Sequence, residues 1–206
     1  MALPRGDPMI TESAFRVVQG FIFLAFVLHR AYYNRKYPAS EGETLEEQRR
    51  STSGWIANLL ALPALLGLLL YLVNPAWISW AALPLPDWSR WLGVLVALAG
   101  FALLQWSHHA LGRNWSDQPR IMQSQTLTTS GPYRWIRPPI YTSFLSILGS
   151  SLLVSANWFI GSLWLALTAI DVRDRMRFEE TRLHARFGRT YESYKQSTGG
   201  LLPRLR

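Results

Sequence analysis

The sequence predicts an all-α integral membrane protein with five transmembrane helices, in which a C-terminal helical hairpin extends into a cytoplasmic helix. Two observations carry this prediction. The chain has apolar runs long enough to cross a bilayer, which takes about 20 helical residues, and its charged residues lie between these runs. Only 17% of the residues are charged, whereas a soluble domain carries about 25%. A soluble bundle of buried helices is the alternative, but runs this long and nearly free of charge suit lipid better.

Five runs qualify, and none has the narrow apolar stripe of a soluble amphipathic helix. They cover about Ala14 to Tyr33, Trp55 to Val73, Trp91 to Trp106, Ile140 to Ser155 and Trp158 to Ile170. Only Ala156 and Asn157 separate the last two runs, which are therefore expected to form a tight hairpin. The 206 residues are expected to form one membrane-embedded domain. Residues 1–110 would hold three spans, and residues 111–206 would hold a connector, the hairpin and a cytoplasmic tail.

Positive charge alternates between the connections and predicts the topology. The connections after the first and third runs each hold several arginines, the connection after the second holds Arg90 alone, and the connection after the fourth holds none. Nine further Lys or Arg residues follow the fifth run, from Arg173 to Arg206. Because cationic loops stay cytoplasmic, the N-terminus is expected outside the membrane and the C-terminus inside.

The 10 tryptophans fit this topology, because tryptophan concentrates at the two membrane interfaces. One set would form an outer belt: Trp77, Trp80, Trp88, Trp91 and Trp158. A second set would form an inner belt: Trp55, Trp106, Trp115 and Trp135. Trp164 falls in the middle of a span and is expected to pack between helices.

The composition excludes several classes of chemistry. The absence of cysteine rules out disulfides, thiolate metal sites and a cysteine nucleophile. The adjacent His108 and His109 diverge by about 100° on a helix, so they do not suit one metal ion, and no metal site is expected. The net charge of +8 is accounted for by cytoplasmic loops beside anionic lipid. No nucleic-acid partner is expected, because the chain has no room for a separate basic module.

A polar connector lies just before the fourth run and carries the first candidate site. Gly131-Pro132 predicts a turn in it. Arg137 and Pro138 both precede a proline, which favours extended backbone, and Pro139 suits the first turn of a helix. Arg137 is thus expected just before a helix N-terminus at the cytoplasmic interface, where it would favour an anion. A basic anchor at the level of the lipid headgroups is an equally good interpretation.

A second polar segment continues the fifth run as a cytoplasmic helix. One face of this helix holds Arg177 and Glu180, and another holds Glu179, Leu183 and Phe187.

The end of this segment is unusual for a solvated helix. Gly188 is a candidate C-cap. An ordinary surface helix would contain ion pairs four residues apart, such as Asp171 with Arg175. It would not need the aromatic Tyr191 and Tyr194, which stand where a soluble tail is normally polar.

These residues together resemble a known family. The connector shows Gly131, Pro132, Tyr133, Arg134, Arg137, Pro139 and Tyr141. The tail shows Glu179, Glu180, Leu183, Phe187, Gly188, Tyr191, Tyr194 and Pro203. In this combination the chain is similar to the isoprenylcysteine carboxyl methyltransferase and phospholipid methyltransferase-like membrane enzymes. Their signature is Gly-Pro-Tyr-Arg-x-x-Arg-His-Pro-x-Tyr, a helical hairpin, and then Glu-Glu-x-x-Leu-x-x-x-Phe-Gly-x-x-Tyr-x-x-Tyr.

The resemblance covers roughly residues 100–206. Upstream of the connector, Asn114-Trp115-Ser116 also resembles the family. One position departs from the pattern, because Pro138 stands where the family usually has histidine.

The resemblance implies S-adenosyl-L-methionine-dependent methyl transfer at the cytoplasmic membrane face, with S-adenosyl-L-homocysteine as the product. It implies a cofactor pocket between the connector and the helix at 177–194, with Glu180, or Glu179 as the alternative, near the ammonium and sulfonium charges of the cofactor. The implied cofactor contacts are Leu127, Thr129, Gly131, Pro132, Tyr133, Arg134, Pro138, Pro139, Glu179, Glu180, Leu183 and Phe187. The implied catalytic residues are Arg137, Glu180 and Tyr141. No Gly-x-Gly-x-x-Gly loop follows a strand pattern, so a Rossmann-type site is not expected.

The implied acceptor is a lipophilic small molecule or a lipidated chain. A carboxylate acceptor would need no general base, so positioning and exclusion of water would carry the rate. Arg137 is suited to hold such an anion through two parallel hydrogen bonds. Three alternatives stay open: a phospholipid-type N-methyltransferase, a membrane reductase of related fold, and a catalytically lapsed membrane protein, which Pro138 favours.

Overall fold

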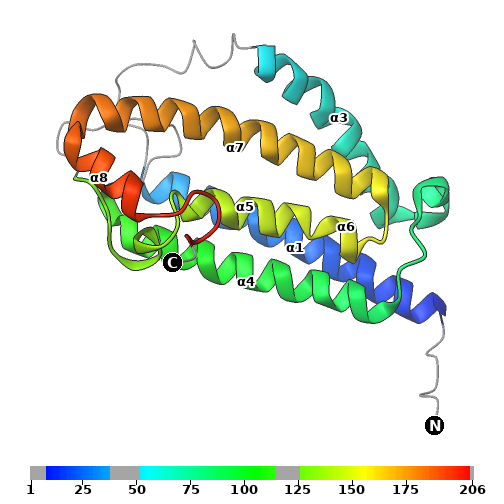
Figure 1. Ribbon diagram of the computed structural model, residues 1–206. Coiled ribbons are helices and arrows are strands. Elements are labelled where there is room, and N and C mark those ends of the chain that lie inside the picture. The colour runs from blue at the N-terminus through cyan, green and yellow to red at the C-terminus, as the bar shows by residue number, and fades with distance from the viewer. Residues whose placement is uncertain (1–7, 38–51, 115–125, 205–206) are drawn as a thin grey trace.

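The computed structural model describes residues 8–37, 52–114 and 126–204, and in these ranges the protein is helical (Figure 1). The long helices are α1 (Pro8–Lys36), α3 (Thr52–Val73), α4 (Asp87–Leu111) and α7 (Trp158–Phe187). The shorter ones are α5 (Pro139–Gly149), α6 (Ser151–Val154) and α8 (Arg189–Ser197). Three 3₁₀ segments connect them: η1 (Pro75–Ala81), η2 (Gly112–Asn114) and η3 (Gly131–Arg134). The all-α prediction is confirmed for these residues.

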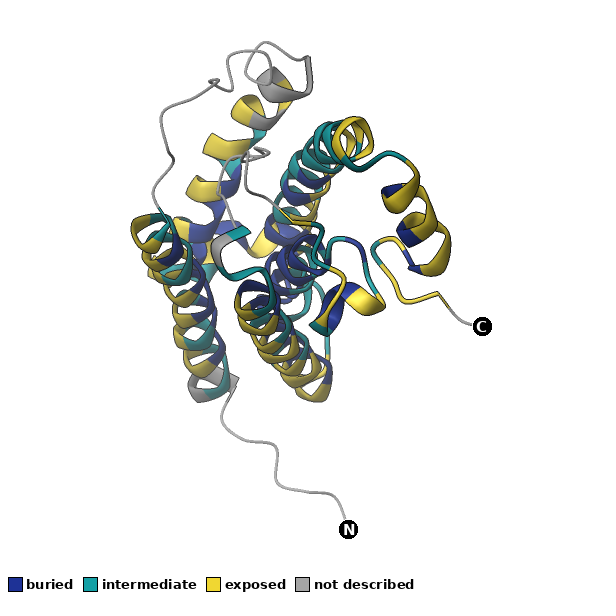
Figure 2. Cartoon of the chain, turned by 90° about the vertical axis from the view of Figure 1, so that its left-hand side faces the viewer, coloured by how far each residue is buried: buried dark blue, intermediate teal, exposed yellow. Residues whose placement is uncertain are grey.

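Helices α1, α4, α5 and α7 run lengthwise beside one another, and α3 tilts away from them at one end (Figure 1). The short helices α5 and α6 lie in the middle of the bundle, where α5 contacts α1, α4 and α7. This central position explains why α5 is largely buried although it is only 11 residues long. Figure 2 shows the same pattern, with buried residues at the centre and exposed ones on the outside.

Small residues on α4 let α5 and α6 approach it closely. Gly93, Ala97, Gly100 and Leu104 are all buried on one face of α4. A Cβ on Gly100 would lie 2.8 Å from Cγ1 of Ile147, so any larger residue would push the two helices apart. Stripes of small residues are typical of helix contacts inside membranes, where close backbone approach supplies the packing energy.

The outer surface of the bundle is apolar, the reverse of a soluble protein. Large side chains that are more than half exposed include Phe21, Leu59, Leu62, Leu95 and Leu98. Within the residues that the structure describes, two helices are long and apolar enough to cross a membrane, Thr11–Lys36 and Asp87–Leu111, and two shorter apolar helices cover Asn58–Val73 and Pro139–Val154. These features support a membrane location, whereas five spans remain a prediction.

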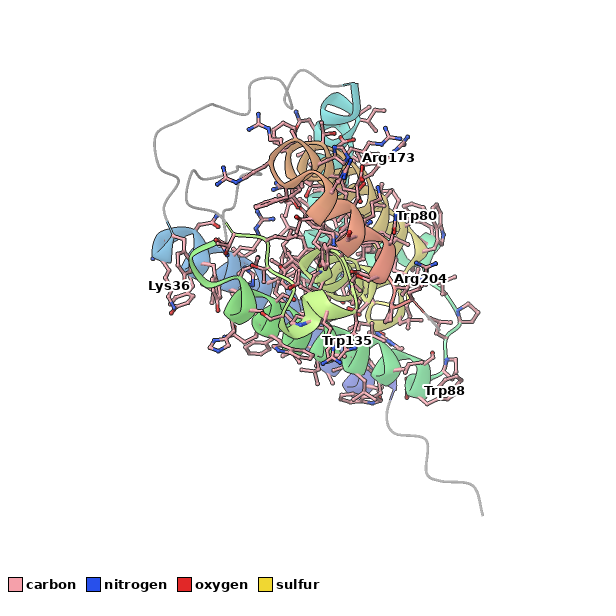
Figure 3. The ribbon with its side chains drawn as sticks, turned by 60° about the vertical axis from the view of Figure 1, so that its left-hand side comes forward. Lys36, Trp80, Trp88, Trp135, Arg173 and Arg204 are labelled. Carbon is pink, nitrogen blue, oxygen red and sulfur yellow. The ribbon has the colours of Figure 1, made fainter. Side chains whose placement is uncertain are left out.

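Apart from Trp164, the described tryptophans lie near the ends of helices or in the connections between them. The rings of Trp80 and Trp158 lie 5.7 Å apart, and so do those of Trp106 and Trp135. Figure 3 shows Trp80 and Trp88 on the side of the molecule opposite Lys36. The side chains of Trp55 and Trp115 lie outside the described residues, as does the structure of 115–116.

Trp164 packs between helices, as predicted. Its ring meets that of Phe23 on α1 edge-on, with centroids 4.6 Å apart.

The second half of the chain follows the predicted order of helices, with one interruption. The fourth apolar run is broken at Ser150 into α5 and α6. Residues 155–157 then turn the chain, and the Asn157 side chain caps α7 by accepting a hydrogen bond of 3.1 Å from the N–H of Ile160. Helix α7 continues without a break to Phe187, and Gly188, with φ +48°, ends it as expected.

A buried ion pair ties four helices together at the end of the bundle where α1 begins. Arg90 on α4 is 5% exposed and donates to both carboxylate oxygens of Glu12 on α1, at 2.6 and 3.3 Å. It also donates to the hydroxyl oxygen of Tyr71 on α3, at 3.0 Å, and to the carbonyl of Val154 on α6, at 3.0 Å. All three guanidinium nitrogens of Arg90 thus have partners. We call these residues the Arg90 cluster.

Candidate functional site

The connector ahead of α5 is fixed by the C-terminal segment that runs beside it. The hydroxyl of Tyr194 on α8 donates to the carbonyl of Tyr133 at 2.7 Å. The N–H of Gly199 donates to the carbonyl of Trp135, and the N–H of Arg137 donates to the carbonyl of Gly200, each at 3.1 Å. The backbone on both sides of Arg137 is therefore held by the tail of the same chain.

Arg137 lies just before α5, as expected from its prolines, and the structure shows that it is buried there. It precedes Pro138, the N-cap of the helix, through a cis peptide bond, and only 9% of its surface is exposed. Its Nη2 atom lies 3.1 Å from Oε1 of Glu180 on α7. Lys195 on α8 approaches the other oxygen of Glu180 at 2.9 Å. Glu180 is therefore shared by two cations, and it links α7 to the connector and to α8.

Several buried donors around Arg137 have no hydrogen-bond acceptor in the described structure. They are Nε and Nη1 of Arg137 and the hydroxyl groups of Tyr133 and Tyr191. The guanidinium carbon of Arg137 lies 5.8 Å from the centre of the Tyr191 ring, so these two residues are neighbours. Tyr133 is joined to the same helix α8 through its backbone carbonyl and the hydroxyl of Tyr194. Burial raises the pKa of Tyr191 to about 12, which keeps its hydroxyl protonated at neutral pH.

A buried donor without a partner costs about 1–3 kcal/mol. A protein keeps several such donors together where a ligand supplies the acceptors. The cluster is therefore suited to bind a ligand with carboxylate or hydroxyl oxygens.

The second carboxylate, Glu179, faces a different partner from Glu180. The hydroxyl of Tyr141 on α5 donates a short hydrogen bond to its Oε1 atom. Burial raises the pKa of Glu179 to about 7, against the opposing effects of the Tyr141 hydrogen bond and of Arg175. Glu179 therefore changes its charge near neutral pH, which suits a group that binds a cation or accepts a proton.

The other residues predicted to contact the cofactor differ in how far they are buried. Pro132, Tyr133 and Pro139 are buried, whereas Leu127, Gly131 and Pro138 are partly exposed. Leu183 and Phe187 are partly exposed on the turns of α7 that follow Glu179. Thr129 and Arg134 are exposed, and the guanidinium of Arg134 lies over the ring of its neighbour Trp135, 5.5 Å from the centroid.

The structure adds residues that the sequence did not single out. Lys195 became a partner of Glu180 only through the fold, because its sequence context is that of an ordinary surface lysine. Gly199 and Gly200 hold the connector through their backbone, which leaves no signal in side-chain type. The position of Gly199 is special, since a Cβ there would lie 2.0 Å from the carbonyl oxygen of Leu202.

The fold and the site are those of a helical membrane protein whose connector and C-terminal helices enclose a cluster of charged and tyrosine side chains. Residues 91–185 match the model of the isoprenylcysteine carboxyl methyltransferase family. The chain is 30% identical over 129 residues to protein-S-isoprenylcysteine O-methyltransferase of Rattus norvegicus. The aligned segment covers 61% of this chain and 45% of the rat protein. The same figures hold for the protein of that name from Mus musculus.

A solved structure of the eukaryotic intramembrane Ras methyltransferase, an isoprenylcysteine carboxyl methyltransferase, shares the fold. The TM-score is 0.53 at 18% sequence identity, and the match covers 78% of this chain and 54% of that one. The chain thus spans about half the length of these relatives. Residues 91–185 are therefore similar to the isoprenylcysteine carboxyl methyltransferase family, and the chain shares its helical membrane fold with a solved structure of that name.

Proposed function

We propose that this protein is an S-adenosyl-L-methionine-dependent methyltransferase that methylates the carboxylate of a lipophilic acceptor at the cytoplasmic membrane face. One observation carries the proposal most directly. The Nη2 atom of buried Arg137 is paired with Glu180, whereas its Nε and Nη1 donors have no acceptor among the described residues. The names of the curated relatives, which are O-methyltransferases of isoprenylcysteine, support the reaction type.

The residues present fit the cofactor that this reaction requires. S-adenosyl-L-methionine, when bound, supplies an electrophilic methyl group on a positively charged sulfur. Glu179 and Glu180 are the carboxylates suited to its two positive charges, and the unpartnered hydroxyls of Tyr133 and Tyr191 are suited to its oxygens.

Of the two carboxylates, we favour Glu179 as the contact for the cofactor. Glu180 is already shared by two cations, Arg137 and Lys195, at 3.1 and 2.9 Å. Glu179 is hydrogen-bonded by the neutral hydroxyl of Tyr141, and no ion pair within the described residues holds it. Glu180 then acts on Arg137, whose orientation it fixes.

Arg137 would hold the acceptor carboxylate, and its surroundings would keep it in place. The backbone contact with Gly200 and the ion pair with Glu180 fix both ends of the side chain. The guanidinium is planar and presents donors in several directions, so it can serve Glu180 and a second anion together. A carboxylate is nucleophilic without losing a proton, so orientation and exclusion of water carry the rate.

One observation favours a second candidate, N-methylation of a lipid amine. An amine must be deprotonated before it attacks, and Glu179, with a pKa of about 7 beside Tyr141, is a group that takes up a proton at neutral pH. A carboxylate acceptor makes no use of this property.

We further propose the arrangement in the membrane: five spans, a hairpin formed by α5, α6 and α7, an outer N-terminus and a cytoplasmic C-terminus. The exposed apolar side chains and the tryptophans at both ends of the bundle support it. The chain has no native cysteine, so a single cysteine at Ser197 reports the side directly. Labelling of that cysteine from the outside alone would overturn the assignment.

The function is tested with the full chain in lipid nanodiscs. Calorimetry with S-adenosyl-L-homocysteine should show binding. Binding of NADPH instead would indicate a reductase. Binding of neither compound would indicate a lapsed enzyme. Transfer of a labelled methyl group is then compared between a farnesylated cysteine and a phosphatidylethanolamine. Methylation of the carboxylate supports O-methylation, and methylation of the amine alone would replace it with the second candidate.

A further inference from the structure

A second feature of the structure adjoins the Arg137 site at Glu180, on the face where α7, α5 and the C-terminal segment meet. A cavity of about 330 Å³ lies there and is partly open to the surroundings. Most of its wall is apolar: Leu145, Ala169, Val172, Met176 and Leu201. This volume is at the lower end of the range for ligand pockets, roughly 300–1,000 Å³. The cavity can therefore take up part of one flexible apolar chain.

Two arginines border this cavity and have no counter-charge. Arg173 and Arg177 both line it, and both are exposed. Neither has an ion pair within the described part of the chain. They lie four residues apart on one face of α7, a spacing at which like charges repel. Figure 3 shows Arg173 projecting from the bundle surface.

Among the described residues, the nearby acids form no ion pair with these arginines. Asp174, which lies between them in the sequence, does not line the cavity and is in no ion pair with either arginine. Asp171 is paired with Arg175, at 2.9 Å. Glu180, which also lines the cavity, is paired with Arg137 and Lys195. The polar end of the cavity therefore carries excess positive charge and is complementary to an anion.

The position of the arginines along α7 matches the headgroup layer of a bilayer. In the proposed topology the fifth span ends at about Ile170, and a helix rises 1.5 Å per residue. The backbone of Arg173 then lies about 5 Å beyond the hydrocarbon, within a headgroup layer that is roughly 5–8 Å thick on each side. The backbone of Arg177 lies about 10 Å beyond it, just past the outer edge of that layer, from which a long arginine side chain can reach back to a phosphate. Ala169 and Leu145 lie toward the hydrocarbon.

We propose that this cavity binds an anionic phospholipid of the adjacent leaflet, with part of one acyl chain among the apolar residues and the phosphate on Arg173 and Arg177. The inference uses the membrane arrangement proposed above, but not the methyl transfer. The partly open shape favours a membrane lipid over the methyl acceptor, because methyl transfer requires a site closed to water.

The test measures lipid retention by the full chain in nanodiscs of phosphatidylcholine with and without phosphatidylglycerol. Native mass spectrometry after extraction should show a retained phosphatidylglycerol. Each arginine near a headgroup contributes about fivefold in affinity, so Arg173→Gln with Arg177→Gln should weaken retention about 25-fold. The matched control, Arg35→Gln with Arg189→Gln, removes the same charge from exposed sites elsewhere and should retain the lipid.

A second pair of variants tests the apolar part of the cavity. Ala169→Phe fills it without changing charge and should abolish retention, whereas Ala185→Phe, on the same helix outside the cavity, should not. Equal retention of both lipids by the wild type, or equal losses in the arginine pair and its control, would overturn the site. Displacement of the lipid one for one by the methyl acceptor would also overturn it and assign the cavity to the acceptor.

The two proposals fail independently. Binding of S-adenosyl-L-homocysteine and methyl transfer are measured on the same variants. A protein that retains the lipid but transfers no methyl group contradicts only the proposed function. If methyl transfer is equally fast with and without the retained lipid, the proposed methyltransferase function stands, whatever the outcome at the lipid site.

Discussion

Two buried arginines in the described part of the chain each pair with a glutamate on another helix, and they differ in how many of their guanidinium nitrogens have hydrogen-bond partners. Arg90 uses all three guanidinium nitrogens, on Glu12, Tyr71 and Val154. Arg137 uses Nη2 on Glu180, while its Nε and Nη1 have no acceptor in the described structure. Both side chains are at least nine-tenths buried.

This difference separates a structural ion pair from a binding site. A satisfied buried pair contributes to holding helices together, and nothing remains in it for a ligand. An incompletely satisfied pair costs stability in the absence of a ligand and regains it when a ligand arrives. The following substitutions test this contrast, from the largest expected effect to the smallest.

Replacing Arg90 should cause the largest loss of stability. Arg90→Met leaves Glu12 without its cation, and removal of one partner from a buried pair costs about 3–5 kcal/mol. The side chain of Glu12 is 33% exposed, so we expect the lower value, about 3 kcal/mol. Thermal unfolding in detergent checks this. The double variant Arg90→Met with Glu12→Leu should recover most of the loss, and no recovery would contradict the account.

Replacing Arg137 should affect the reaction more than stability. In Arg137→Lys a single ammonium group replaces the planar guanidinium and cannot reproduce its hydrogen bonds to both Glu180 and the acceptor carboxylate. Turnover should therefore fall on the order of 10²-fold. Binding of S-adenosyl-L-homocysteine and the melting temperature should change little. If Arg137 is a headgroup anchor, the same variant keeps full turnover, and the residue leaves the catalytic set.

The two glutamates should differ in their effect on cofactor binding. Loss of a charge-assisted contact weakens binding by roughly 10- to 100-fold. We expect this loss in Glu179→Ala by calorimetry, with a smaller change in Glu180→Ala, whose main defect should be turnover. The reverse order would assign the cofactor to Glu180.

Cofactor binding should also depend on pH through Glu179. Its pKa is raised to about 7 by burial, so the carboxyl is neutral below that pH and charged above it. Affinity for S-adenosyl-L-homocysteine should therefore fall about tenfold between pH 8 and pH 6, as the charged fraction falls. Glu179→Gln should flatten this profile, and an unchanged profile in that variant would exclude Glu179 as its source.

The smallest effect is expected at Pro138. The connector is held by Gly199, Gly200 and Tyr194, so the backbone stays in place whichever residue follows Arg137. Pro138→His should bind S-adenosyl-L-homocysteine as well as the wild type or better. If the wild type fails to bind and this variant binds, the natural protein is a lapsed enzyme.

The sequence by itself determined the helical class, the order of the elements and the position of the connector. Apolar runs of this length favour helices. Pro139 suits the first turn of a helix because its φ is already fixed at a helical value. Local chemistry also determined the end of α7, because Gly188 accepts a positive φ that other residues resist. The ion pair of Asp171 with Arg175 followed from spacing alone.

The tertiary structure decided which charged groups meet. Glu179 and Glu180 are neighbours in sequence, and only the packing of α5 and α8 against α7 sends one to Tyr141 and the other to Arg137 and Lys195. The role of Arg90 was equally invisible, since a single arginine in a short connection is typical of an exposed loop. Sequence patterns report the local backbone and the period of burial, whereas the partner of a charge lies on another helix, brought close by contacts between residues distant in the chain.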